Sequence, residues 1–550
     1  MKSLGSNEPR GTDRLGWPVS EGLSAGNRSR GSYHSFQFVV RLRQDMHEAL
    51  DQHSGGISST QNFEILDAFS TYFHETLHWW QHIGSTTGLL LSLSPPMQSH
   101  INYEHLRFVL QKIGPEKPLK RLTEGPPGGY APDVDACLNR IVNNWHDLEY
   151  NRRILLNPMM LSDVLHSPYF ESQGHSILIG LANLLLLLGA TFDLDFRCIP
   201  RPMAWEEATA DLRYRKINGY CFGSTVRTTP IGALHIFEGQ ARFSQLQYLY
   251  LATNGKMSWE QFRSTGRLGG VYVEAFETYL RITGCKWPST PDAPDVLLFL
   301  LVCDLAMNPS DGYPFDIRHF ESLIESADPG IRFCWFCSQI ARRPCLRDAV
   351  ARCDSNSYLE VAAFLCNSLV CETPVGIARE LMRWVSQAQG FANLLSQESA
   401  SSYSEDNLPL RLCFAKHLRF MDQRIRSPEF FCWPAMHFVE RKGADVNLQE
   451  TLEIFNRHQP PFVAHPDGEI RPALFQGMSE KNLYKTFNTF YYWILEYDLI
   501  SQWIVGDGPF DLDFTWMHPL YTPSFTKPWA DDAFKRHFGI SLDKFNVLSG

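Results

Sequence analysis

The chain has 550 residues, of which 44% are hydrophobic and 20% charged, and this balance is typical of a globular protein with a buried core. Aromatic residues make up 13% of the chain, which excludes a disordered or fibrous protein. The 50 lysine and arginine residues are outnumbered by 60 aspartate and glutamate residues, so the net charge is −10. A general nucleic-acid binder needs a basic field that neutralises phosphates, so we expect no nucleic-acid partner.

Cysteine usage and the N-terminal segment indicate the compartment. The 13 cysteines lack the paired spacing of a secreted disulfide scaffold, and the N-terminus has no apolar segment typical of a secretory signal. The most apolar stretch, 177–190, would rise only about 21 Å as a helix, which is short of the roughly 30 Å hydrocarbon core of a membrane. The sequence therefore predicts a buried core helix there, no membrane partner and a soluble, cytoplasmic protein.

The first predicted elements are a tail, a strand and a helix. Residues 1–33 are rich in Gly, Ser, Asn and Arg and are predicted to be a flexible tail. Apolar residues alternate with others over 35–42, which predicts a strand. Over 63–82 they recur at steps of three and four, which predicts an amphipathic helix that ends at Gly84. Residues 114–132 are rich in Pro and Gly and are interpreted as a loop that forms a lid or a boundary.

Most of the chain beyond residue 132 shows helical periodicity. The predicted helices lie at 136–156, 176–190, 204–216, 233–252, 294–307, 358–369 and 481–504. A polar segment at 397–407 is typical of a linker and divides a domain at 34–396 from a C-terminal helical accessory domain at 408–550. The sequence therefore predicts a mainly α fold with a small β component, large helical insertions and a C-terminal helical part.

The predicted helix at 63–82 carries a metal-binding pattern. Residues 74–78 read H-E-T-L-H, and the composition of the chain gives roughly 0.04 chance matches to H-E-x-x-H. His74 and His78 are four residues apart, so both imidazoles project from one face and can reach one metal ion. His82 continues this face but lies about 6 Å further along the axis, too far for the same ion. The alternative is a helix whose histidines are solvated or satisfied within the core.

This helix resembles the active-site helix of the zincin metallopeptidases. The extended metzincin pattern, with a glycine and a third histidine, is absent after His78, so the resemblance is to the gluzincin type. It implies that His74, His78 and a glutamate from a later helix bind Zn²⁺. It also implies that Glu75, as general base, takes a proton from a metal-activated water that attacks a peptide bond. The implied protein is a zinc-dependent metallopeptidase acting on protein or peptide substrates.

Two segments compete for the third ligand. Glu238, in F-E-G-Q-A-R, is similar to the E-G-x-A helix of several gluzincins, and its place in an apolar stripe would bury a carboxylate that needs a partner or a metal. Glu207, in W-E-E-A-T-A-D, resembles the E-x-x-A-D version, with Asp211 able to orient a histidine. Arg242 is a competing partner for Glu238, and basic neighbours favour a solvated face around Glu207. We predict Glu238 as the ligand and hold Glu207 in reserve; the two could also act together.

The resemblance covers a small part of the chain. It matches the helix at 63–82 and one helix at 233–252, with the strand at 35–42 as an edge that aligns an extended substrate. The fold implied is a zincin-like pair of active-site helices interrupted by a large helical insertion. His235, one turn before Glu238, is predicted to stabilise the oxyanion in catalysis, with Tyr214 and Tyr248 as weaker alternatives.

The cysteines form one further pattern. Cys334 and Cys337 make a C-x-x-C motif, followed by Cys345 and Cys353. A redox pair would need a strand leading into a helix N-terminus that lowers the thiol pKa, and a zinc site would need a more familiar spacing. We interpret these residues as scattered free cysteines.

Two other functions stay open at this point. A zincin-like fold that binds zinc without turnover would be a regulatory or interaction module, whose insertion and C-terminal part contact a regulatory protein partner. A metal-dependent amide hydrolase would use the same residues on a non-peptide substrate. Retained zinc without turnover on any peptide would favour the first, and cleavage of small amides alone would favour the second.

Overall fold

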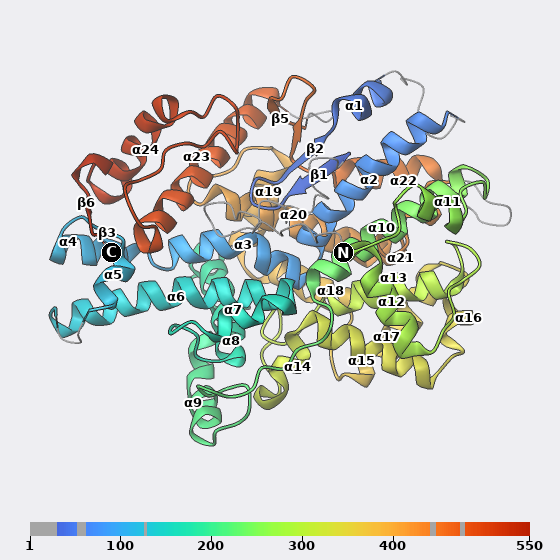
Figure 1. The fold of residues 1–550 in the computed structure, drawn as a ribbon, viewed down its shortest axis with the longest axis horizontal. Helices are drawn as coiled ribbons and strands as arrows, with labels where there is room; N and C mark the ends of the chain where they lie inside the picture. The colour runs from blue at the N-terminus through green and yellow to red at the C-terminus, as the bar shows by residue number, and fades with distance from the viewer. Residues whose placement is uncertain (1–29, 52–61, 126–128, 440–446, 474–478, 550) are drawn as a thin grey trace, which may run out of the picture.

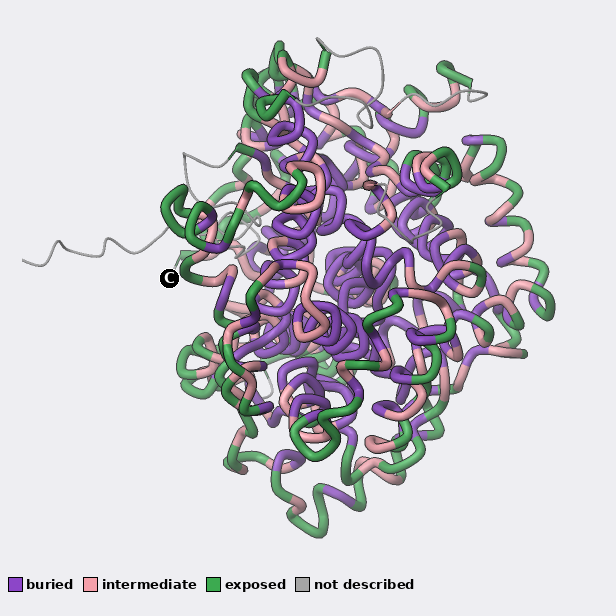
Figure 2. Tube along the Cα trace, turned by 90° about the vertical axis from the view of Figure 1, so that its right-hand side faces the viewer, coloured by how far each residue is buried: buried purple, intermediate pink, exposed green. Residues whose placement is uncertain are grey.

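The protein is mainly helical with a small β component, as the sequence predicts. The computed structural model describes residues 30–51, 62–125, 129–439, 447–473 and 479–549, with helices making up 66% and strands 4% of the structure. Figure 1 shows α2 and α10 near each other, and they pack together, with the strands β1 and β2 beside α2. Buried residues gather in the interior and exposed residues on the outer turns (Figure 2).

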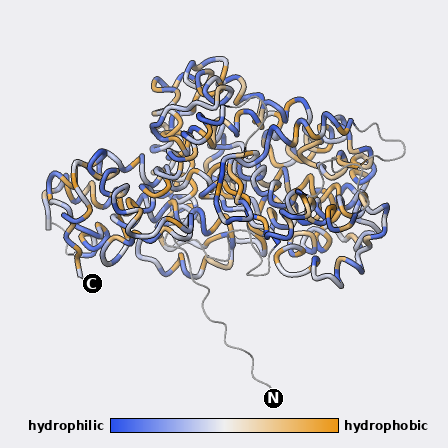
Figure 3. Tube along the Cα trace, turned by 90° about the horizontal axis from the view of Figure 1, so that it is seen from above, coloured by the Kyte–Doolittle hydropathy of each residue, from blue (hydrophilic) through white to orange (hydrophobic). Residues whose placement is uncertain are grey.

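The helices fall into two runs along the chain. The first run is α1 Gln44–Asp51, α2 Phe63–Gly84, α3 Thr86–His100, α4 Tyr103–Ile113, α5 Leu119–Thr123, α6 Pro132–Leu156, α7 Leu161–Leu165, α8 Gln173–Phe192, α9 Glu206–Tyr214, α10 Ala233–Ala252, α11 Trp259–Ser264 and α12 Val271–Thr283. The second is α13 Pro294–Ala306, α14 Leu323–Ala327, α15 Pro329–Arg342, α16 Leu346–Val350, α17 Ser355–Ser368, α18 Pro374–Gln387, α19 Gln389–Ser399, α20 Leu408–Arg426, α21 Pro428–Cys432, α22 Leu448–Arg457, α23 Glu480–Val505 and α24 Pro523–Phe538. Apolar and polar residues alternate along most of them, as expected of amphipathic helices (Figure 3).

Two small sheets join segments from the two ends of the chain. The larger has the order β1-β2-β4-β5, in which β1–β2 and β4–β5 are antiparallel and β2–β4 is parallel. Its strands are β1 Gly31–His34, β2 Val39–Leu42, β4 Phe462–Ala464 and β5 Ile470–Pro472, and the smaller sheet pairs β3 Glu116–Lys117 with β6 Asn546–Val547. The larger sheet lies between α2 and α23, because the Phe38 ring packs on both Trp79 and Phe490.

Helices α2 and α10 pack side by side in opposite directions. The side-chain amide of Gln81, near the end of α2, bonds to the Phe237 carbonyl near the start of α10. Near the start of α2, the hydroxyl of Ser70 accepts a hydrogen bond from Gln245 Nε2, later in α10, at 3.1 Å. The side chain of Asn62 caps the first turn of α2 by accepting from Glu64 N. Nearly every residue of α2 is buried, so this helix is the centre of the core.

The C-terminal end of α2 is held by α20. His417 Nδ1 lies 2.7 Å from the Ile83 carbonyl, and Arg424 Nη1 donates to the Gly84 carbonyl at 3.1 Å. These bonds satisfy carbonyl groups that the last turn of a helix leaves without partners. Arg424 in turn pairs with Asp304 of α13 at 2.7 Å, so the buried charge is compensated.

Several predicted elements can be compared directly with the structure. Helix α10 has the predicted bounds, and α2 and α23 are longer than predicted by one or two residues at an end. The predicted strand at 35–42 is wrong in its first half, because residues 35–38 form a turn with Phe38 at φ 53°. The predicted tail extended to residue 33, but β1 begins at residue 31, and residues 1–29 lie outside the described part. The predicted loop at 114–132 contains β3 and α5.

The predicted linker and the apolar helix can also be located. Residues 397–407 span the end of α19 and the segment before α20, and one hydrophobic cluster includes residues from both sides of them. The division into two domains stays a prediction. Within the described residues, α8 is the one helix whose length and composition would allow it to cross a membrane. Of its most apolar 18-residue stretch, 67% is buried inside the protein.

The junction between α2 and α3 makes a stability prediction. A Cβ at Gly88 would lie 2.1 Å from the Gln81 carbonyl and 2.6 Å from His82 Cα, so backbone atoms would have to move. We expect Gly88→Ala to lower the free energy of unfolding by about 1–3 kcal/mol, measured as a lower urea midpoint at an unchanged m value. Gly269→Ala is the matched control, because a Cβ there meets nothing within 4 Å. Equal midpoints for the two variants would contradict this packing.

Candidate metal centre

Three side chains from α2 and α10 converge in the core. His78 Nε2 lies 3.1 Å from His74 Nε2, and each of these nitrogens lies 3.6 Å from Glu238 Oε2. All three residues are buried, and their ligand atoms lie within 4.8 Å of one another. The i, i+4 spacing on α2 brings the two imidazoles together, and the antiparallel packing of α10 brings the carboxylate to them. This is the one such group of three or more His, Cys, Asp or Glu found among the described residues.

The spacing of these atoms fits a metal ion. In a tetrahedral site with bonds of 2.0–2.1 Å, neighbouring ligand atoms lie about 3.3–3.4 Å apart, close to the separations seen here. Two buried atoms of the group, His74 Nδ1 and Glu238 Oε2, have no hydrogen-bond partner in the described structure. A buried carboxylate oxygen without a hydrogen bond is costly, and a cation between it and the two nitrogens would remove that cost. The group can therefore hold a metal ion.

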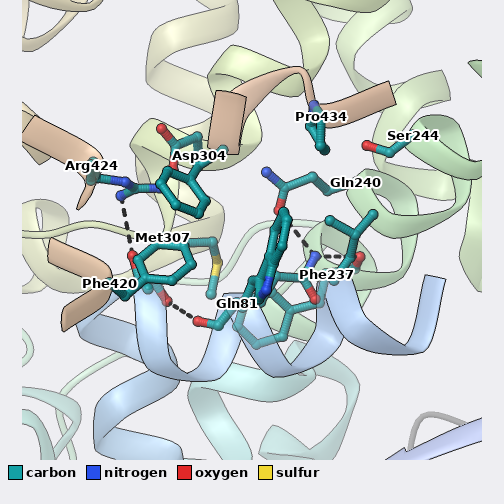
Figure 4. A pocket seen from close by; sticks show the side chains of 14 residues that line it. Gln81, Phe237, Gln240, Ser244, Asp304, Met307, Phe420, Arg424 and Pro434 are labelled. Atoms are coloured by element: carbon teal, nitrogen blue, oxygen red, sulfur yellow. Dashed lines mark hydrogen bonds and ion pairs between the residues drawn. The ribbon is translucent and has the colours of Figure 1, made fainter. Parts of the chain in front are cut away.

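Gln81 fixes the orientation of one ligand. Its Oε1 lies 2.8 Å from His78 Nδ1, and its Nε2 donates to the Phe237 carbonyl at 2.9 Å and to Gln240 Oε1 at 3.0 Å. Because the amide nitrogen is committed to two acceptors, the amide oxygen faces the imidazole and selects the tautomer with a proton on Nδ1. His78 Nε2 is then left as an electron-pair donor, which a metal requires. Figure 4 shows Gln81 between Phe237 and Gln240.

The electrostatics of the three ligands are coupled. Burial lowers the pKa of His74 to about 3, so its imidazole is neutral. Burial opposes a charge on His78, but Glu238, Glu75 and the hydrogen bond to Gln81 together hold the pKa of His78 above its usual value. Although burial alone would raise the pKa of Glu238, the nearby imidazoles hold it well below its usual value. One buried negative charge is thus matched by a proton on an imidazole, and a bound cation would take the place of that proton.

Glu75 lies beside this group and against β1. It is 4% exposed, and its Oε2 has no hydrogen-bond partner among the described residues. A Cβ at Gly31 would lie 2.8 Å from Glu75 Cγ, so the glycine allows the strand to approach this closely. Burial raises the pKa of Glu75 to about 8, and the charge of Glu238 adds to this, whereas His78 and the Tyr33 backbone oppose it.

Two further residues border the group. Sequence analysis did not identify Tyr272, and it considered Arg242 only as a competing partner for Glu238. The Tyr272 ring, from α12, lies edge-on to the His74 ring at 6.2 Å between centroids. The Arg242 guanidinium, one turn after Glu238 on α10, lies 4.0 Å over the face of Tyr272. Burial raises the pKa of Tyr272, and the charges of Glu238 and Glu75 add to the shift. No motif marks Tyr272, because it comes from a third helix and reaches the site through tertiary packing.

The other predicted site residues lie elsewhere. His235 lies in the first turn of α10. Its Nδ1 accepts a hydrogen bond from Gly232 N at 3.1 Å, and its Nε2 lies 3.2 Å from Glu274 Oε2. Both ring nitrogens therefore have local partners, and its role as an oxyanion donor stays a prediction. Glu207 is exposed on α9 and is not part of the metal-binding group, and Asp211 of the same helix pairs with Arg215 at 3.3 Å.

The two tyrosines proposed as alternatives to His235 have surroundings of different kinds. Tyr214 is 89% exposed at the end of α9. Tyr248 is buried, and its ring packs on Phe69, Phe73 and Phe438 in the core. Within the described structure, neither ring makes the edge-on contact with His74 that Tyr272 makes.

His82 and the cysteines have structural surroundings. His82 is buried, with Nδ1 2.9 Å from Ser92 Oγ, and burial lowers its pKa to about 3. All 13 cysteines are free thiols. Burial raises the pKa of Cys334 to about 11 and that of Cys337 well above its usual value, so neither is a reactive thiolate.

Comparison with known proteins adds no relative to this description, since no family model, no curated protein and no solved structure matches the chain.

The choice between the two candidate glutamates predicts metal contents. We expect Glu238→Gln to reduce the metal bound per chain from about one to well below one, because the amide removes the buried negative charge that the cation compensates. Glu207→Gln is the matched control and should keep the wild-type content, since its side chain is exposed away from the group. Inductively coupled plasma mass spectrometry measures both. Loss of metal in the Glu207 variant alone would assign the third ligand to α9.

The Gln81 contact predicts an effect on affinity. Gln81→Ala removes the acceptor that holds His78 Nδ1–H, so we expect metal affinity to fall by about 10- to 100-fold. Competition with a chromophoric chelator measures this change. Gln98→Ala is the matched control, because Gln98 also donates to a backbone carbonyl, that of Trp145, but lies on α3. An unchanged affinity in the Gln81 variant would show that the tautomer is set without this amide.

Proposed function

We propose that the protein is a zinc-dependent metallopeptidase in which His74, His78 and Glu238 bind one Zn²⁺. The observation that carries the proposal is the convergence of the two H-E-x-x-H nitrogens on Glu238 Oε2, at 3.6 Å each, with Glu75 buried beside them. Two imidazoles and one carboxylate are a ligand set that zinc uses in hydrolases, where a fourth position stays open. The resemblance of the α2 motif to gluzincins supports the same reading.

Glu75 and Tyr272 would have different roles in the proposed reaction. Zinc, when bound, would polarise the substrate carbonyl and lower the pKa of water. The charge of a bound zinc would favour the ionised form of Glu75, whose Oε2 would then accept a proton from the attacking water and pass it to the leaving nitrogen of the amide. Tyr272, edge-on to His74, would donate a hydrogen bond from its hydroxyl to the oxygen of the carbonyl under attack.

A peptide substrate is supported by the outer edge of β1. Arg43 N donates to the Arg30 carbonyl at 2.8 Å, which makes these residues a hydrogen-bonded pair of the hairpin. Backbone groups alternate along an antiparallel strand, so those of Gly31 and Tyr33 point away from β2. The Tyr33 backbone hydrogen-bonds to Glu75, so the groups of Gly31 are the ones a substrate chain would pair with. Glu75 packs at Gly31, so an extended chain along this edge would present an amide beside the general base. The free thiols of all 13 cysteines support a reducing compartment, and we propose a cytoplasmic location.

A second candidate function is zinc binding without turnover, in a regulatory or interaction protein. The observation that favours it is burial: His74, Glu75, His78 and Glu238 are each at most 4% exposed. A structural metal site is closed in this way, whereas a hydrolase must admit its substrate. The half-buried Tyr272 and Arg242 border the group and mark the side from which a substrate would enter.

The role of Glu75 separates the two candidates. We expect Glu75→Gln to keep about one zinc per chain but to lower kcat on a cleaved peptide by about 10²–10⁴-fold, because the amide cannot take the proton. Glu64→Gln, at the first turn of the same helix, is the matched control and should keep both zinc and activity. Zinc content and peptide-library cleavage are the measurements. Wild-type zinc with no cleavage of any peptide would favour the binding protein.

A further inference from the structure

We infer that the substrate carries a carboxylate close to the scissile amide and that Arg242 binds it. This inference rests on the proposed peptidase function and names the substrate class of the same site. Arg242 follows Glu238 by four residues on α10, so both side chains lie on one face of the helix. The chain therefore places a permanent positive charge next to the proposed zinc ligand.

Arg242 is held by an aromatic ring and an amide, and no ion pair of its guanidinium is found among the described residues. Its guanidinium lies 4.0 Å over the Tyr272 ring, and Nη1 donates to Gln245 Oε1 at 2.5 Å. The Nε atom is buried and has no hydrogen-bond partner in the described part of the chain. The expected internal partner was Glu238, but that carboxylate makes its ion-pair contacts with the two histidines instead. Arg242 thus keeps donors and a full charge for a ligand.

Arg242 lies close to the proposed reaction centre. It projects from α10 one turn after Glu238, so its guanidinium lies close to the proposed zinc ligands. Its aromatic support, Tyr272, contacts the His74 ring edge-on. A substrate group bound by Arg242 would therefore lie beside the amide held near Glu75, not at a distant subsite.

Two further arginines, Arg30 and Arg267, lie in the same region as Arg242. Asp67, two turns before His74 on α2, pairs with Arg267 at 2.7 Å and also with Arg30. One carboxylate is thus shared by two guanidinium groups, and Arg242 is a third cation in the same region. Burial lowers the pKa of Arg30, and the charges of Arg267 and Arg242 add to this shift. Because Asp67 pairs with Arg30 and Arg267, Arg242 is the one of these three arginines left to attract an anionic substrate group.

A carboxylate is the anion that this arrangement fits best on a peptide. A guanidinium presents parallel N–H groups that match the two oxygens of a carboxylate, and stacking on an aromatic ring reduces the entropy lost on binding. The carboxylate can come from an aspartate or glutamate side chain or from the C-terminus of the peptide. Both sources share this chemistry, and matched peptides distinguish them.

The experiment compares peptides that differ in one charge. Each peptide that the zinc-loaded wild type cleaves is paired with variants that replace Asp by Asn, Glu by Gln, or the free C-terminus by an amide. We expect kcat/KM to fall by about 10- to 100-fold when the relevant carboxylate is removed, and the arm that responds identifies its source. In Arg242→Gln the acidic and neutral peptides should be cleaved equally, and Arg242→Lys should restore part of the preference.

Arg263→Gln is the matched control, because Arg263 also stacks on an aromatic ring, that of Trp287 at 5.1 Å, but belongs to α11. It should keep the wild-type preference. Calorimetric binding of the same peptide pairs to the zinc-loaded Glu75→Gln variant gives a readout that needs no turnover and should show the same ratio.

The outcomes separate the two claims. Cleavage of acidic and neutral peptides at equal rates by the wild type would overturn the inference and leave the peptidase proposal intact. A preference that survives in Arg242→Gln would also overturn the inference, because another group would then bind the carboxylate. Absence of cleavage and of binding for every peptide would overturn the proposed function, and the inference with it.

Discussion

The contact between α2 and α10 is the interaction on which the rest of the structure depends. It brings a glutamate carboxylate against two imidazoles in a buried part of the core. A buried charge of this kind costs several kcal/mol unless it is compensated, so neighbouring groups must either neutralise it or bind a cation with it. The arrangement of the three residues could hold a metal ion, and Gln81 holds one imidazole in the tautomer that a metal needs.

The surrounding fold makes this contact rigid. Helix α2 is enclosed by the larger sheet on one side, by α10 on another, and by α20 at its C-terminal end. Strands from residues 31–42 and 462–472 pair in one sheet, so segments far apart in the sequence stabilise the same helix. Rigid surroundings hold the ligands near their binding geometry before a metal arrives, which favours a specific ion over loose association. A long chain is needed here because nearly every face of one helix is covered.

Local patterns predicted the parts of the site that lie within single helices. The i, i+4 spacing of His74 and His78 and the apolar stripe around Glu238 are both local, and the structure brings these three residues together. Local pattern favoured Glu238 over Glu207 but did not show which glutamate lies near the histidines. The structure brings Glu238 to them because α10 packs on α2.

The parts that sequence missed depend on tertiary contacts. Strand β1 is four residues long and lies in a segment whose composition resembles a tail, so its pairing with β2 is what orders it. Arg242 lies near His74 because α10 packs on α2, and Tyr272 reaches it because α12 packs on α10. His235 stood at a suitable spacing from Glu238, but spacing does not reveal that both of its ring nitrogens already have partners at the helix start.

The most direct test of the central claim is X-ray absorption spectroscopy at the zinc edge, on full-length protein purified without added metal. The account predicts about one zinc per chain, coordinated by nitrogen and oxygen at about 2.0–2.1 Å, with the scattering pattern of two imidazoles. A first shell containing sulfur at about 2.3 Å would place the metal on cysteines instead. That result, or protein that takes up no zinc even when zinc is supplied, would contradict the assignment of His74, His78 and Glu238.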